Sequence, residues 1–465
     1  MGPKDLQLHR ESYLGTKLSG ETVQVFFKEK GSVRLPRISR GEGIFFWDTD
    51  GHRYIDVSSG PVTNNLGSGN KTVLSAMEIQ AKAAAFAFPG QFESEANERL
   101  SNLLTSLAGP GFERAFFVSG GSEAVESSIK LARQYALTKN EASRYKIISC
   151  QPSYHGATLG ALTLTGDIHM HDVFGPMMKK MPKVSAPLTY RLPHGHTKES
   201  FARNCALELE DCIKREDPKT VLAFIFEPIG GLATGAVVSD NFYMKEVRRI
   251  CDKYGVILIH DEVMSGAGRT GKFLASNHYA DAKPDIVVLA KGIAAGFTPL
   301  GAVLAGGHIV NAISSAGGFL NGFTYFTNPL SCAIGNAVLQ EIRDCDLIAN
   351  AAKRGAEFKR ALENLKTHSN YVGDVRGKGL LLALELVADK HTKSSFKCQL
   401  NVASLFQNLA LKNGLMIYGR RTNYGDFGDW LMMTPPLIIT KEQVFEISNA
   451  LAKTLQDFER YVNAN

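Results

Sequence analysis

The order of apolar and polar positions along this chain predicts alternating strands and helices in its central part. Short apolar runs are typical of buried strands, and longer stretches between them have the spacing of amphipathic helices. Strand, crossover helix and strand repeated in this way indicate a mostly parallel sheet with helices on both faces. The predicted strands are 115–118, 145–149, 221–226, 256–261, 285–290 and 300–305, and the predicted helices are 93–108, 122–138 and 241–254.

The two ends of the chain follow other patterns. Residues 1–65 are irregular, with a hairpin expected around Asp50 and Gly51. Beyond about 335 the pattern predicts a small α+β unit, with helices at 335–343, 349–365 and 441–461 and strands near 380–386 and 431–433. We therefore expect an α/β fold with a large domain over 66–335. A smaller domain should combine the N-terminal segment 1–65 with the C-terminal segment 336–465.

Composition excludes several classes of function. The net charge of +6 is spread along the 465 residues without a basic run, which argues against a nucleic-acid partner. The seven cysteines are scattered and include no Cys-x-x-Cys, so neither a disulfide framework nor a metal site is expected. The polar N-terminus lacks the apolar core of a signal peptide, and no stretch is long enough to span a membrane. These features predict a cytoplasmic protein.

Two predicted strands end in residues with opposite charges. Lys291 follows the apolar run 285–290, and Asp261 ends the run 256–261. An amine at the end of a buried strand should have a lowered pKa, and a neutral amine can form a Schiff base. A carboxylate on the neighbouring strand can pair with the pyridinium nitrogen of pyridoxal phosphate. The alternative is a buried Lys–Asp ion pair that serves packing only.

Loops after two further strands carry residues suited to the same cofactor. Strand 115–118 runs into Ser119, Gly120, Gly121 and Ser122 and then a helix, an arrangement that can bind phosphate or can be an ordinary serine cap. Tyr154, in the sequence Tyr154-His155-Gly156, could cover one face of a planar ring or lie in a surface loop. Val263 could pack on the other ring face or belong to the core.

One glycine-rich stretch imitates a nucleotide site. Gly266-Ala-Gly-Arg-Thr-Gly271-Lys272 matches both a dinucleotide pattern and most of a P-loop. Phe273 replaces the Ser or Thr that would bind magnesium, and no long helix is predicted to follow. A P-loop nucleotide-binding protein is therefore only a remote alternative.

Taken together, these motifs make the chain resemble the class III, or omega, aminotransferases, a branch of the fold-type-I pyridoxal-phosphate-dependent enzymes. The resemblance covers most of the chain in the family's order. Its motifs are 119–126, 154–156, Glu227-Pro228, 261–271, Ala290-Lys-Gly292, Gly322-Phe-Thr-Tyr325 and Asn328-Pro329.

The resemblance implies an aminotransferase that uses pyridoxal 5'-phosphate. Lys291 would form the Schiff base and move the proton, and Asp261 would hold the ring nitrogen. Thr324 would reach the phosphate of a neighbouring subunit, so a homodimer would share its active sites. The other residues implied at the cofactor are Gly120, Gly121, Ser122, Tyr154, His155, Glu227 and Val263.

The chain departs from the family pattern at Ser119-Gly-Gly, at Met264 and at Asn328, but not at the lysine or the aspartate. The amino donor and acceptor remain open, although Ser59, Arg420 and Arg421 are candidates for contacting substrate, the arginines through a carboxylate. An aminomutase, racemase or epimerase on the same scaffold is the nearest alternative to transamination. A tetramer is the alternative to the dimer.

Overall fold

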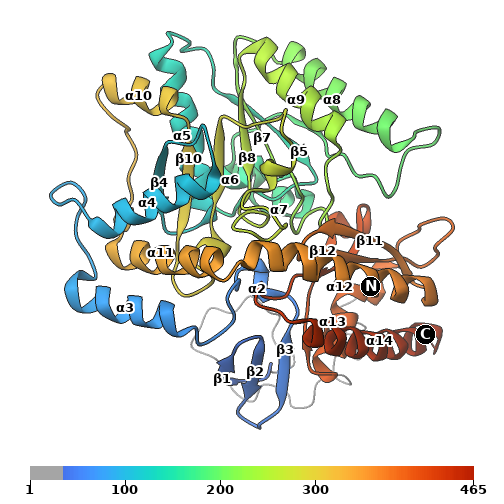
Figure 1. The fold of residues 1–465 in the computed structure, drawn as a ribbon. Coiled ribbons are helices and arrows are strands. Elements are labelled where there is room, and N and C mark those ends of the chain that lie inside the picture. Colours follow the sequence, from blue (N-terminus) through green and yellow to red (C-terminus); the bar gives the residue numbers. More distant parts are fainter. Residues whose placement is uncertain (1–34, 465) are drawn as a thin grey trace.

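The structure is a computed structural model that describes residues 35–464 (Figure 1). The polar first residues that argue against a signal peptide lie outside this range. Among the described helices, none combines the length and the apolar character needed to cross a bilayer.

A seven-stranded sheet with the order β4-β10-β9-β8-β7-β5-β6 forms the centre of the molecule. Strands β5 to β9 pair in parallel, whereas β10 runs antiparallel to both of its neighbours. The predicted mostly parallel α/β sheet is confirmed. Its strands are β4 (Arg114–Val118), β5 (Lys146–Gln151), β6 (Lys183–Ser185), β7 (Val221–Phe226), β8 (Ile257–Asp261), β9 (Ile286–Leu289) and β10 (Gly301–Ala305).

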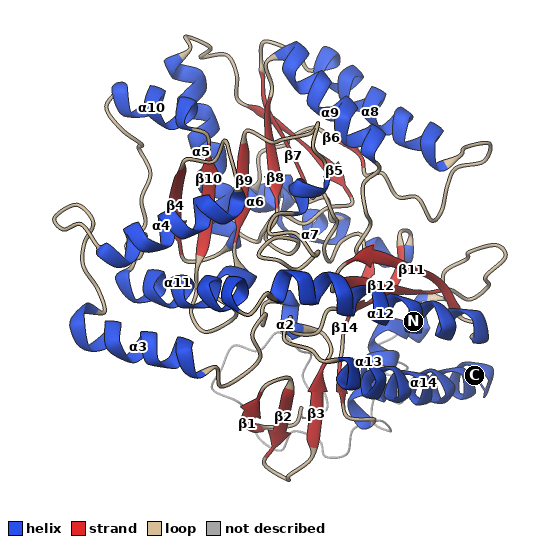
Figure 2. Cartoon of the chain, viewed as in Figure 1, coloured by secondary structure: helices blue, strands red, loops and turns tan. Residues whose placement is uncertain are grey.

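Helices cover both faces of this sheet (Figure 2). Phe224 and Leu258 pack with α8 (Lys198–Arg215) and α9 (Asn241–Tyr254). Ile225 and Ile259, the next residues on the same strands, pack on the opposite face with α5 (Gly121–Thr138). Successive side chains of a strand point to opposite faces, so a strand buried on both sides is a continuous apolar run. That is why apolar runs located these strands in the sequence.

Further helices surround the sheet. The α-helices are α2 (Ser59–Val62), α3 (Lys71–Ala84), α4 (Glu95–Ala108), α6 (Leu159–Leu164), α7 (Ile168–Phe174) and α10 (Gly307–Ser315). The short 3-10 helices in this part are Gly175–Met177, Ala275–His278 and Lys291–Ile293.

Helix α11 (Pro329–Asp344) begins earlier than the predicted 335–343. Asn328 caps it by accepting the Ser331 backbone N–H at 3.0 Å, and Pro329 occupies the first turn. The helix packs on α3 and α4 and crosses the expected boundary at 335/336. The domain boundaries at 65/66 and 335/336 therefore stay predictions.

The C-terminal part contains an antiparallel sheet in the order β11-β12-β15-β14. Its strands are β11 (Val372–Lys378), β12 (Leu381–Leu386), β14 (Tyr418–Thr422) and β15 (Gly428–Met433), and its helices are α12 (Leu347–His368), α13 (Val402–Lys412) and α14 (Lys441–Ala464). Two short 3-10 helices, Cys398–Leu400 and Asn423–Gly425, complete this part.

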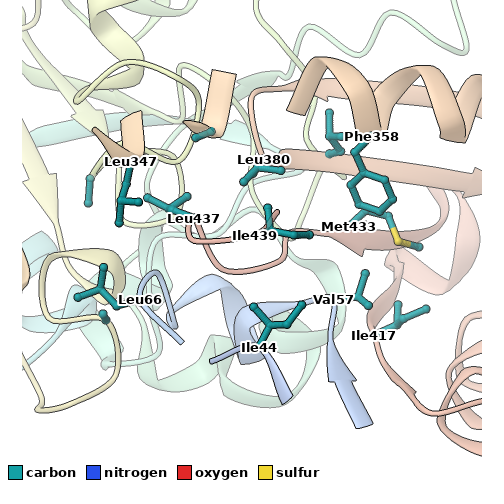
Figure 3. Packing of buried hydrophobic residues seen from close by; sticks show 14 of the residues in the cluster. Ile44, Val57, Leu66, Leu347, Phe358, Leu380, Ile417, Met433, Leu437 and Ile439 are labelled. Atoms are coloured by element: carbon teal, nitrogen blue, oxygen red, sulfur yellow. The ribbon is translucent and has the colours of Figure 1, made fainter. Parts of the chain in front are cut away.

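The N-terminal hairpin joins the C-terminal part through a third sheet. Its strands are β1 (Ile38–Glu42), β2 (Phe45–Asp48) and β3 (Arg53–Asp56). Strand β3 pairs in parallel with β13 (Leu415–Met416). Beside this sheet, Ile44 and Val57 belong to the same buried cluster as Phe358, Met433 and Ile439 (Figure 3). The first and the last described parts of the chain therefore share one core.

Candidate active site

Lys291 lies directly beyond the end of β9, at the start of a short 3-10 turn. Its φ of +50° is a left-handed conformation that a lysine rarely adopts. The turn is held by Asn65, whose Nδ2 donates to the carbonyls of Ala267 and Gly292 at 3.1 and 3.4 Å. A Cβ at Gly292 would lie 2.4 Å from the same Nδ2, so glycine is required there.

Burial makes the Lys291 amine a better nucleophile. It lowers the pKa of Lys291 to about 8, although the nearby charges of Asp261 and Glu227 act in the opposite direction. A large share of the amine is therefore neutral near pH 8, as the sequence predicts for a Schiff-base lysine.

Asp261 ends β8, the strand that pairs with β9. The side chain is 5% exposed. Its Oδ1 accepts the Val263 backbone N–H at 3.0 Å, and its Oδ2 accepts from His155 Nδ1 at 2.8 Å. Two donors thus fix the orientation of this carboxylate, and no arginine or lysine forms an ion pair with it in the part of the chain that the structure describes.

The two loops singled out in the sequence meet above Asp261. Helix α5 begins at Gly121, so its first N–H groups lie at the end of β4. The Ser122 hydroxyl accepts the Ala157 N–H at 3.0 Å, and a Cβ at Gly156 would lie 2.7 Å from that hydroxyl. A Cβ at Gly121 would lie 3.0 Å from Val263. Close approach explains both glycines, and a helix N-terminus free of side-chain bulk suits an anion.

Glu227 lies just beyond the end of β7, next to Tyr154. One of its carboxylate oxygens accepts the Gly231 N–H at 2.8 Å, and the other accepts the Tyr154 N–H at 3.4 Å. Burial raises the pKa of Glu227 to about 7. These contacts fix the backbone of Tyr154 and make Glu227 a positioning residue for that loop.

The two candidate arginines on β14 point in different directions, as neighbours on a strand do. Arg420 pairs with Asp167. Burial raises the pKa of Tyr154 and the charge of Arg420 opposes that shift, so Arg420 lies near Tyr154. Arg421 instead lies 3.3 Å from Asp429 and donates to the Phe396 carbonyl at 2.7 Å. Asp167 is the site residue that sequence reasoning missed, because nothing local marks it as the partner of Arg420.

Ser59 and Thr324 do not join this cluster within the chain. The Ser59 side chain is buried, and its hydroxyl donates to the Thr434 carbonyl at 2.7 Å. Thr324 is exposed in the loop before α11. The Ser59 hydroxyl thus has a partner within the chain and its contact with substrate stays a prediction, while Thr324 faces outward.

The glycine-rich stretch 266–272 is not built as a nucleotide loop. The element that follows it is the short 3-10 helix Ala275–His278, which offers no long helix to a phosphate. Arg269 at its centre is 1% exposed and donates to Asn65 Oδ1 at 2.5 Å and to the Pro435 carbonyl. The stretch thus supports the Asn65 contact that holds the Lys291 turn, which rules out the P-loop alternative.

Comparisons with known proteins agree with this geometry. A profile of the family described as "Aminotransferase class-III" matches residues 27–455. An uncharacterized aminotransferase of Bacillus subtilis, YodT, is 36% identical over 93% of this chain and 98% of its own. A diaminobutyrate–2-oxoglutarate transaminase of Halomonas elongata is 34% identical over 92% and 90%.

A solved structure is equally similar. The amine transaminase of an uncultivated Pseudomonas species, in its PLP-bound form, superimposes with a TM-score of 0.87 at 32% identity and covers 94% of this chain and 99% of its own. Together the profile, the relatives and the fold leave one assignment. The chain belongs to the class III aminotransferases, the pyridoxal-phosphate-dependent enzymes that transfer an amino group from a donor to an oxo acceptor.

Proposed function

We propose that Lys291, Asp261 and the loops around them form the cofactor and proton-transfer site of this aminotransferase. The observation that carries the proposal is the pairing of β8 with β9, which puts a buried carboxylate and an amine of lowered pKa at neighbouring strand ends. The residues fit the cofactor, since Asp261 offers a fixed carboxylate and Gly121 leaves the start of α5 accessible. An amino-donor panel with pyruvate and 2-oxoglutarate as acceptors tests the activity and identifies the substrates.

Each side chain then has a defined task. Bound pyridoxal phosphate supplies an electron sink that acidifies the carbon bearing the amino group. Asp261 holds the ring nitrogen protonated, and His155 orients Asp261. Lys291 would take the proton from the substrate carbon and deliver it to the cofactor.

The remaining residues bind and orient the cofactor. The N–H groups of Gly120, Gly121 and Ser122 bind the phosphate. Tyr154 and Val263 would hold the ring between them, and Glu227 holds Tyr154 in place. An aminomutase, racemase or epimerase would be recognised because the donor would yield no stoichiometric amount of oxo product.

The cytoplasmic location stays a prediction from the sequence.

We further propose that Arg420 binds the carboxylate of the substrate, which must displace Asp167 from the guanidinium. Arg420→Met should raise the KM for a 2-oxo acid acceptor about 10- to 100-fold, the equivalent of one lost charge-assisted contact. Steady-state kinetics with pyruvate would measure this. Kinetics with an aldehyde acceptor serve as the control, because that substrate has no carboxylate. Equal losses for both acceptors would contradict the assignment.

The active site is proposed to be shared between two copies of the chain. The loop that holds Thr324 exposes apolar side chains, with Leu320 84% and Tyr325 63% exposed. The ring centroids of Phe86 and Tyr325 lie 6.0 Å apart. A patch of this kind usually marks an interface, and a second copy would bring Thr324 to the partner's phosphate.

Thr324→Val should therefore weaken retention of the cofactor by about 1–2 kcal/mol, the scale of one hydrogen bond to a charged group. Mixed dimers of Lys291→Ala and Thr324→Val chains would contain one site with both lesions and one with neither. After random exchange in an equal mixture, half of the sites that carry Lys291 lie in mixed dimers. Titration with pyridoxal phosphate should then show that this half regains parental affinity. A fully active monomer in light scattering, or no recovery on mixing, would rule out the shared site.

A further inference from the structure

A cavity of about 510 Å³ lies between the edge of the central sheet and the C-terminal sheet. Lys183 and Ser185 of β6 form one wall, and Arg376 and Glu385 of β11 and β12 form another. The cavity is separate from the active site, because β6 is the edge strand and none of its lining residues is among those proposed to bind the cofactor. Its size is within the usual range for a site that holds a small organic molecule.

The floor of the cavity holds a network of paired charges. Glu385 is 1% exposed, and its two carboxylate oxygens are taken by Arg191 and Arg376 respectively. Arg376 also pairs with Asp374 at 3.2 Å, so two carboxylates balance the two guanidinium groups. Lys183 adds a further amine, whose Nζ donates to the Thr163 carbonyl at 2.6 Å.

Two further acidic residues line the cavity. Glu208 and Asp426 are both exposed at its rim. Glu208 accepts the Ser185 N–H at 3.1 Å, so it is already engaged by the backbone. The charges at the cavity therefore balance, and its uncommitted hydrogen-bond donors decide what it binds.

Two buried donors at the cavity have no hydrogen-bond partner among the described residues. The Thr234 side chain is 6% exposed and its hydroxyl is unpartnered, as is the buried Nη2 of Arg191. Buried polar groups are nearly always hydrogen-bonded, so these donors point to a ligand that accepts from them. Apolar side chains complete the walls, among them Leu188, Phe201 and Phe427.

We propose that this cavity is a second binding site, for a small carboxylate with an apolar or aromatic body. The guanidinium of Arg191 and the hydroxyl of Thr234 would bind the carboxylate, and the aromatic walls would enclose the rest. The inference goes beyond amino transfer and does not depend on which substrates the active site takes.

Shared lining residues connect the second site to the active site. A smaller cavity of about 20 Å³ shares Ala186, Leu188, Thr234 and Val237 with it and is lined by Glu227. Because Glu227 holds Tyr154, a ligand that moves the shared wall should change the KM for substrate without competing with it.

Calorimetric titration of the holoenzyme with benzoate tests the proposal, in an Arg420→Met background that removes the carboxylate contact proposed for the active site. Saturable binding is expected, and it should weaken about tenfold in Thr234→Val and in Arg191→Lys, the scale of one hydrogen bond to a charged group. Thr367→Val, an exposed position on α12, is the matched control and should bind as tightly as its parent.

Arg191→Lys keeps a charge beside Glu385, and a thermal melt shows whether that chain still folds. If the Arg191→Lys chain does not fold, the affinity of Thr234→Val for benzoate tests the proposal alone. Absence of saturable benzoate binding in the Arg420→Met background would overturn the proposal, as would equal affinity in Thr234→Val and its parent.

Discussion

Lys291→Ala is expected to abolish amino transfer while leaving the fold intact. Acid–base catalysis alone contributes about 10²–10⁴-fold to a rate, and the variant also loses the covalent partner of the cofactor. Within residues 35–464 no ion pair to the Lys291 side chain is formed whose loss would unfold the molecule, and burial disfavours the charged amine by lowering its pKa. Alanine should therefore cost little free energy of unfolding.

Two measurements check this outcome. Single-turnover kinetics should show no oxo product, and the absorbance of the Schiff base should be missing although pyridoxal phosphate still binds. Lys378→Met is the matched control, since burial also lowers the pKa of Lys378 but this residue ends β11 in the C-terminal sheet. That control should keep near-parental rates. Near-normal turnover in Lys291→Ala would end the assignment.

Asp261→Asn is expected to keep the cofactor but to lose about 10²–10³-fold in rate, the size of one lost electrostatic contact in a preorganised site. Asparagine has the same shape, so Val263 N–H and His155 can still be accommodated. A neutral amide cannot hold a protonated ring nitrogen, and the substrate carbon becomes less acidic.

The effect should appear in kcat more than in KM, because charge at this position matters for the reaction and not for substrate contact. Absorbance spectroscopy would show in parallel whether the cofactor is retained. Asp240→Asn, at the N-cap of α9, is the control and should change neither value, since asparagine caps helices equally well. A rate for Asp261→Asn within a few-fold of the parent would show that the ring-nitrogen assignment is wrong.

The central strands were predictable because their signal is local. Strand β7 lies at 221–226 and helix α9 at 241–254, in agreement with the apolar pattern. Strands β1 and β14 were missed, since β1 is largely exposed and β14 is partly buried, so neither has a continuous apolar run. The start of α11 was placed too late because the cap at Asn328 was not recognised.

The sequence also did not predict the direction of β10. An apolar run shows that both faces of a strand are buried, but it says nothing about which neighbour the strand pairs with or in which sense. The connection between Leu289 and Gly301 contains only the short Lys291 turn, which is too brief for a parallel crossover, so β10 returns antiparallel.

By itself the sequence determined which residues after strands are proposed for the site. Lys291 and Asp261 could be found because each ends a buried apolar run, and the carboxyl ends of strands in an α/β sheet face the ligand. The glycines at 120 and 121 were found for the same reason, from a strand that leads directly into a helix.

Only the tertiary structure decided the contacts between distant segments. Arg420 and Asp167 are 253 residues apart, and their pairing separates Arg420 from its neighbour Arg421. Contacts between distant segments also produce the pairing of β3 with β13, the burial of Arg269 and the cavity beside β6. The physical reason is that such contacts arise from how whole elements pack, and periodicity along the chain records only which side of each element is buried.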